Sequence, residues 1–233
     1  MRHTETAIQA PELDAHVGVG AKPLVRPLPR VRVLLDLSPA AIDARAEKHG
    51  VEFWQLRTPL TAYRRHSGVP YALDNGCFGG SLPPAWGRMI EEAKRQTPLW
   101  ATSPDVIGSA RRTLELWPRF TSQMNGIPRA LVLQDGIGDF DIPWHELACV
   151  FIGGSDSFKS SPEARQAAVA ARMLGKLVHV GRVNTYARAR EWADLADSYD
   201  GSGISRDPRD EQLAAVLAGI RGDPATLPLF DAD

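Results

Sequence analysis

The chain has little cysteine, since its 233 residues include only Cys77 and Cys149. Two thiols make neither a disulfide framework nor a four-ligand zinc site, so we expect reduced cysteines and no bound metal. No apolar run approaches the ~20 residues that cross a bilayer, and the N-terminus lacks the apolar stretch of a signal peptide. The sequence therefore predicts a cytoplasmic protein with no membrane segment.

An excess of charge of either sign is also missing. The 27 Lys and Arg residues nearly balance the 28 Asp and Glu residues, which leaves a formal net charge of -1. The protein as a whole does not attract nucleic acid, so binding of that kind needs a local basic surface. An apolar fraction of 43% is enough for one sizeable folded core.

The composition changes along the chain in a way that indicates one domain with an arm. Residues 1–29 are polar and contain four prolines, which is typical of a flexible arm. Residues 30–233 are predicted to form a single domain, because from Val31 onward short β-rich runs alternate with helical patterns. Eight candidate strands match a TIM-type (β/α)8 barrel of the α/β class. The end of the chain is expected to pack Leu229 and Phe230 on this barrel.

Local signals mark where the elements begin and end. Ser38-Pro39 and Ser161-Pro162 each offer an N-cap followed by proline, and Gly50 and Gly175 occupy positions suited to helix C-caps. The expected strands are Val31–Leu35, Phe53–Leu56, Tyr71–Leu73, Leu99–Thr102, Ala130–Leu133, Cys149–Ile152, Leu177–Val180 and Ser198–Tyr199. The expected helices are Pro39–His49, Pro84–Gln96, Ser109–Trp117, Pro162–Leu174, Thr185–Leu195 and Asp210–Ile220.

Polar residues or glycines follow most of the expected strands directly. In a parallel barrel every strand ends on the same face, so these groups are expected to meet in one pocket although they are far apart in sequence. They are Asp36, Asp74, Asp105, Gln134-Asp135, Gly153-Gly154, Gly181-Arg182 and Asp200.

Aspartate and glycine also occur in such loops for purely structural reasons, as helix caps and turn formers. Asp105 could cap a helix that begins near Gly108, Asp74 could form a turn with Asn75-Gly76, and Asp200 could form one with Gly201. Several acids that each follow an apolar run are harder to explain in this way. A carboxylate cluster with no Lys or Cys/His ligand set beside it favours acid/base and nucleophilic chemistry at a sugar carbon.

Displacement at an anomeric carbon requires two carboxylates with different tasks. One attacks or stabilises an oxocarbenium-like centre while it is ionised, and the other exchanges a proton with the leaving group. A third acid, Asp105, is suited to accept hydrogen bonds from a guanine-like edge, whose N1–H and exocyclic amine are donors.

Six motifs carry these residues in a familiar order: YALDNGCFGG (71–80), SPDV (103–106), VLQDG (132–136), VFIGGSD (150–156), VHVGRVNT (178–185) and DSYDGSG (197–203). Over more than half of the chain, this order resembles the tRNA-guanine transglycosylase superfamily. It is most similar to the phage and bacterial branch that inserts 7-deazaguanine bases into DNA, the DpdA-like proteins.

The resemblance implies a role for each matching residue. Asp74 in the DNG turn corresponds to the general acid/base, and Asp200 in D-S-Y-D corresponds to the covalent nucleophile. Asp105 of SPDV resembles the aspartate that reads the guanine edge, although its distance from the strand differs slightly from the family pattern. Gln134 of VLQDG is similar to the glutamine that hydrogen-bonds the carbonyl of the base.

Three further residues complete the expected pocket. Gly153 and Gly154 resemble the glycine pair whose backbone lines the base pocket, and glycine permits such a close approach. Phe78 offers a stacking surface for a base, or equally a core contact. Gln134 and Asp135 are adjacent on one strand end and should point to opposite sides, so we expect Gln134 alone to face the pocket.

Other residues near the expected pocket have less defined roles. His179 lies within an apolar run and is interpreted as a packed or hydrogen-bonded barrel residue rather than a catalyst. Arg182 and Asn184 follow the same strand and either contact a phosphate or ribose of the substrate or belong to a solvated loop.

The family pattern also predicts the partners. The chain lacks the three cysteines and one histidine of the zinc subdomain found in the tRNA enzymes, which favours DNA over tRNA as the acceptor. The expected reaction exchanges guanine for a 7-deazaguanine base such as the 7-cyano form, with no cofactor. The sequence leaves open whether the protein acts with a partner protein or as a homodimer. The alternatives are a nucleoside or glycoside hydrolase on the same barrel and a catalytically silent nucleic-acid-binding module.

Overall fold

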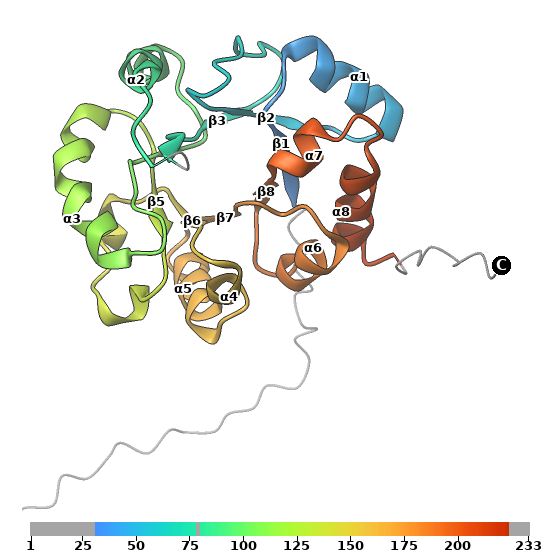
Figure 1. Ribbon diagram of the computed structural model, residues 1–233. Helices are drawn as coiled ribbons and strands as arrows, with labels where there is room; N and C mark the ends of the chain where they lie inside the picture. Colours follow the sequence, from blue (N-terminus) through green and yellow to red (C-terminus); the bar gives the residue numbers. More distant parts are fainter. Residues whose placement is uncertain (1–30, 78–79, 224–233) are drawn as a thin grey trace, which may run out of the picture.

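A computed structural model describes residues 31–77 and 80–223 and shows a closed barrel of eight parallel strands in chain order (Figure 1). The expected TIM-type barrel is therefore confirmed, and the helices lie around its outside. The arm at 1–29, Phe78 and the tail with Leu229 and Phe230 lie outside the described residues. The strands are β1 (Arg32–Leu35), β2 (Trp54–Arg57), β3 (Tyr71–Leu73), β4 (Ala101–Thr102), β5 (Arg129–Leu133), β6 (Cys149–Ile152), β7 (Leu177–Val180) and β8 (Ser198–Asp200).

The expected helices are also present, with shifted ends. Ser38 and Ser161 accept hydrogen bonds from the backbone N–H groups of Ala41 and Ala164, as N-caps should. The α-helices are α1 (Pro39–His49), α2 (Ala85–Arg95), α3 (Ala110–Thr121), α4 (Asp156–Lys159), α5 (Pro162–Met173), α6 (Tyr186–Trp192), α7 (Ser202–Arg206) and α8 (Glu211–Arg221), and the 3-10 helices are η2 (Ser122–Met124), η3 (Ile137–Asp139) and η4 (Trp144–Glu146).

The expected ends of two helices were wrong, and two short helices were not expected. Helix α3 continues through Pro118 to Thr121, because the burial of Trp117 and Thr121 offsets the backbone hydrogen bond that proline removes. Helix α6 ends at Trp192, three residues before the expected end. Helices α4 and α7 were not expected, because four or five residues are too few to show a helical period.

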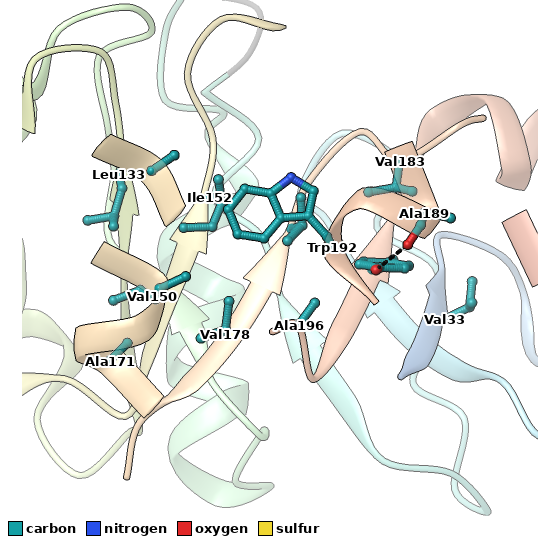
Figure 2. Packing of buried hydrophobic residues seen from close by; sticks show 14 of the residues in the cluster. Val33, Leu133, Val150, Ile152, Ala171, Val178, Val183, Ala189, Trp192 and Ala196 are labelled. Atoms are coloured by element: carbon teal, nitrogen blue, oxygen red, sulfur yellow. Dashed lines mark hydrogen bonds between the residues drawn. The ribbon is translucent and has the colours of Figure 1, made fainter. Parts of the chain in front are cut away.

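The core has two layers separated by the barrel wall. Outward-facing strand residues pack against the helices, and Figure 2 shows Trp192 of α6 surrounded by Ile152, Val178 and Ala196. Inward-facing residues fill the barrel itself. They are Leu34, Leu56, Ala72, Trp100, Ala130, Val132, Cys149 and Phe151.

Strand alternation determines which polar residues enter the barrel. On β5, Ala130 and Val132 point inward, so Gln134 does as well; on β3, Ala72 points inward, so Asp74 follows it. On both strands the last apolar inward residue lies one position before the strand end, and the next inward residue is polar. The fold therefore places a polar layer on top of an apolar plug, at the carboxyl ends of the strands.

Within the described part of the chain, no helix is long and apolar enough to cross a membrane.

Candidate active site

A cavity of about 280 Å³ opens at the carboxyl ends of the strands. The expected site residues Asp74, Asp105, Gln134 and Asp200 line it together. The remaining lining residues are Asp36, Leu56, Thr58, Leu60, Asn75, Ile107, Val132, Phe151, Gly153, Gly154, Arg182, Gly201, Ser202, Ser205 and Arg206.

A larger hollow of about 890 Å³ lies at the amino ends of the strands, lined in part by Val31, Gly50 and Phe53. Four of its charged groups are paired within it, since Arg32 pairs with Glu52 at 3.4 Å and Arg165 pairs with Asp194, and it contains no cluster of carboxyl groups. The cavity at the carboxyl ends is therefore the better candidate for chemistry, although it is smaller.

Asp74 has the most perturbed carboxyl group of the site. Burial and the nearby charge of Asp200 raise the pKa of Asp74 to about 7, against weaker lowering by the hydrogen bond from the backbone N–H of Gly76. That bond, 3.1 Å long, is the Asx turn expected from the sequence, so turn formation and exposure to the cavity coexist in one residue. A carboxyl with a pKa near neutrality can both donate and accept a proton.

Asp105 is held in the cavity by two side-chain amides. Asn75 Nδ2 donates to Oδ1 at 2.8 Å, and Gln134 Nε2 donates to Oδ2 at 2.5 Å. Burial raises the pKa of Asp105 in spite of these hydrogen bonds. The alternative of a helix cap is excluded, because Ser109 caps α3 by accepting from the N–H of Arg112.

Gln134 faces the cavity and Asp135 does not, as the alternation of side chains requires. Gln134 is 2% exposed, and its Oε1 accepts from the N–H of Gly108 at 2.9 Å. Asp135 turns outward and accepts from the N–H of Ser155 at 2.8 Å.

The glycine pair after β6 leaves no room for side chains. A Cβ on Gly153 would lie 2.5 Å from Val132 Cγ1 and 3.3 Å from Gln134 Nε2. Gly154 has a φ of +63°, and a Cβ there would lie 2.5 Å from the ring of Phe158. Both glycines line the cavity, so the backbone itself forms this wall.

Asp200 lies at the end of β8 and contacts a histidine on the neighbouring strand. His179 Nε2 is 2.9 Å from Asp200 Oδ1, and His179 Nδ1 is 2.8 Å from the hydroxyl oxygen of Ser198. His179 is 0% exposed, which agrees with the interpretation of a hydrogen-bonded barrel residue. That its partner is Asp200 could not be read from the sequence.

Two residues that complete the site had no individual role assigned from the sequence. Asp36 follows β1; its Oδ1 accepts from the hydroxyl of Thr61 at 2.6 Å, and burial raises its pKa. Its place directly after an apolar strand is the reason why Asp36 was expected in the pocket, and it does line the cavity. Asn75, which holds Asp105, was read only as a turn residue.

The two polar residues after β7 have different positions. Arg182 lines the cavity and donates to the backbone carbonyl of Gly154. Asn184 instead supports α7, since its Oδ1 accepts from the N–H of Ile204 at 3.2 Å. Among the described residues, no group of three His, Cys, Asp or Glu side chains is placed to hold a metal ion.

No protein-family model and no curated protein matches the chain. Solved structures do resemble it. The native KDPGal structure superposes with a TM-score of 0.53 at 14% identity, over 84% of this chain and 96% of the other. Tryptophan synthase from M. tuberculosis, in an aminoacrylate- and BRD0059-bound form, gives a TM-score of 0.45 at 12% identity, over 83% and 91%. At sequence identities this low, a structural match shows similarity of fold alone. The first of these superpositions agrees with a TIM-type barrel.

Proposed function

We propose that this protein is an enzyme, a nucleic-acid guanine transglycosylase that replaces guanine with a 7-deazaguanine base, with DNA as the favoured acceptor. The observation that carries the proposal is the pairing of Asp74 and Asp200 in one cavity. Asp74 has a pKa of about 7, and the negative charge of Asp200 contributes to that rise. A carboxyl that exchanges protons near neutral pH therefore lies in the same cavity as a second carboxyl that can act as the nucleophile.

The first half-reaction releases guanine. Asp200 attacks C1′ of the target nucleotide, a C1′–O bond forms, and the C1′–N9 bond breaks with its electron pair leaving on the base. Protonated Asp74 supplies the proton that the departing base takes up. The products are free guanine and an aspartyl ester of the sugar.

The second half-reaction runs in the reverse direction with a different base. The incoming 7-deazaguanine gives its N9 proton to ionised Asp74 and attacks C1′, and Asp200 leaves as a carboxylate. Asp74 ends the cycle protonated, so atoms and charges balance without a cofactor. Base recognition is assigned to Asp105, which accepts from the donor edge, and to Gln134.

The size and charge of the cavity support a nucleotide as the occupant. At about 280 Å³ it has room for one extruded nucleoside and none for a duplex, so the target base must leave its stack. Arg182 and Arg206 line the same cavity, and their guanidinium groups suit the flanking phosphates. Because the net charge is close to zero, these local cations carry the attraction to nucleic acid.

The proposal is tested by nucleoside mass analysis after the protein has been incubated with 7-cyano-7-deazaguanine and either duplex DNA or tRNA. We expect the deazaguanine nucleoside in DNA with the wild type, none with Asp200→Asn, and wild-type levels with Asp141→Asn, a control at an exposed aspartate. Incorporation into tRNA alone would reverse the choice of acceptor. Release of free base without incorporation would favour the hydrolase, and neither product would favour the silent binding module.

A further inference from the structure

An imidazole on the barrel interior contacts the proposed nucleophile and has no role in the reaction described above. His179 projects inward from β7, and its register partner on β8 is Ser198, two residues before Asp200. Both ring nitrogens are engaged, Nε2 with Asp200 Oδ1 and Nδ1 with the Ser198 hydroxyl. The ring is fully buried, and of its two partners Asp200 also faces the cavity.

The direction of the hydrogen bonds follows from charge. The proposed function requires Asp200 to act as a carboxylate nucleophile, and a carboxylate can only accept a hydrogen bond. His179 Nε2 must therefore carry the hydrogen in this contact. In the neutral ring Nδ1 is then the acceptor, and the hydroxyl of Ser198 donates to it.

Close packing fixes the plane of the imidazole. The ring centroid of His179 lies 4.7 Å from that of Trp100 and 4.5 Å from that of Phe151. Phe151 can occupy this place because residue 181 is glycine, where a Cβ would lie 2.3 Å from Phe151 Cε1 and 3.2 Å from Asp200 Oδ1. Two aromatic rings and a glycine thus hold the donor nitrogen in one position against Oδ1.

We infer that His179 is a positioning residue for Asp200: it binds Oδ1 throughout the reaction and so directs Oδ2 to the sugar carbon. This inference rests on the proposed function and adds to it which carboxylate oxygen of Asp200 attacks the sugar. When Oδ2 bonds to C1′, Oδ1 becomes the ester carbonyl oxygen and still accepts from Nε2–H. When Oδ2 leaves, the returning negative charge is shared with Oδ1, where the donor is already in place.

Two variants of His179 separate the effect of its hydrogen bond on kcat from the effect of its packing. His179→Phe keeps an aromatic ring against Trp100 and Phe151 but has no donor, whereas His179→Gln retains an N–H near the position of Nε2. For the Phe variant we expect kcat to fall about ten- to a hundredfold, the range for losing a hydrogen bond to a charged group, with KM for the free base unchanged. The Gln variant should recover most of this loss.

Ser198→Ala supplies a coupled control. As a single substitution, Ser198→Ala should lower kcat severalfold, because the tautomer of His179 is no longer fixed. In the His179→Phe background it should have no further effect, since the ring nitrogen that Ser198 contacts is gone. Additive losses in the double variant, or an unchanged kcat in His179→Phe, would overturn the inference and leave the transglycosylase proposal intact.

A readout independent of activity keeps the inference testable if base exchange is never observed. Long-range ¹⁵N–¹H NMR of the histidine-labelled protein reports which ring nitrogen is protonated, with His179→Phe used to assign the signal. We expect a protonated Nε2 at neutral pH and a changed signal in Asp200→Asn. An unprotonated Nε2, or a signal insensitive to Asp200, would refute the positioning role whatever reaction the protein catalyses.

Discussion

Gln134 Nε2 donates a 2.5 Å hydrogen bond to Asp105 Oδ2, which joins the end of β5 to the loop after β4. Because Asn75 holds the other carboxylate oxygen, Asp105 is fixed from both sides before any ligand arrives. A preorganised acceptor of this kind loses little freedom when it binds a donor edge such as that of guanine.

The first prediction concerns base recognition by Asp105. Asp105→Asn replaces one acceptor oxygen with an amide donor, which would face the donor edge of the base, so we expect affinity for 7-cyano-7-deazaguanine to fall about ten- to a hundredfold. Isothermal titration calorimetry with the free base measures this change. Asp135→Asn is the matched control, because Asp135 faces outward and should leave the affinity unchanged. Equal affinity in the Asp105 variant would remove this residue from the base site.

A second prediction follows from the effect of Asp74 on stability. Its pKa is about 7 in the folded chain and near 3.8 in the unfolded chain, so between these values the folded state binds more protons and stability falls as pH rises. A shift of about three units corresponds to an upper bound of about 4 kcal/mol at pH 8. Asp74→Asn should therefore unfold at a higher temperature than the wild type at pH 8, by a margin that narrows at pH 5.

The control variant Asp135→Asn should change the melting temperature in the opposite direction. Burial raises the pKa of Asp135, but hydrogen bonds from Ser155 outweigh it, and the net pKa is lowered. Asp135→Asn should thus lower the melting temperature at pH 8. If Asp74→Asn were less stable than the wild type at pH 8, the raised pKa of Asp74 would be wrong.

A third prediction separates the two half-reactions by pH. Release of guanine requires protonated Asp74, so its single-turnover rate should fall as pH rises through about 7. Attack by the incoming base requires ionised Asp74, so the rate of the second step should fall as pH drops. This fall is expected below pH 7, because esterified Asp200 carries no charge that raises the pKa of Asp74. Rapid-quench measurements of each step give the two profiles. Parallel profiles would show that Asp74 does not exchange the proton in both steps.

A fourth prediction concerns the glycine wall. Ala at position 153 would place a methyl group 2.5 Å from Val132 Cγ1 and 3.2 Å from the carbonyl oxygen of Leu133, so the strand end must shift. We expect Gly153→Ala to destabilise the fold by about 1–3 kcal/mol and to reduce activity further through displacement of Gln134. Chemical denaturation and the exchange assay measure the two effects. Gly87→Ala, in helix α2 with open space around it, should be neutral or slightly stabilising.

The barrel and its polar layer were predictable because they depend on local patterns. Apolar runs followed by Asp74, Gln134 or Asp200 identify strand ends, and parallel strands bring their ends together. All eight strands were placed to within two residues. The sequence could therefore predict that Asp74, Asp105, Gln134 and Asp200 share the cavity, whereas Asn75 and Arg206 were not expected there and Phe78 lies outside the described residues.

The contacts between these residues were not predictable in the same way. The contact between His179 and Asp200 depends on the register of β7 against β8, which pairs His179 with Ser198, and no local pattern reports that register. The raised pKa of Asp74 likewise depends on burial and on a charge that is distant in sequence. Sequence patterns give the members of the site, and the tertiary structure gives their protonation and their partners.

The central claim is that Asp200 forms a covalent bond with the sugar. The direct measurement is to quench the wild type with acid during turnover on its nucleic-acid substrate, separate protein-linked nucleic acid on a denaturing gel, and map the modified peptide by mass spectrometry. We predict an adduct on the peptide containing Asp200, absent in Asp200→Asn and present in Asp36→Asn, which alters a neighbouring carboxylate of the same cavity. Base exchange without an adduct, or an adduct on another residue, would contradict the account.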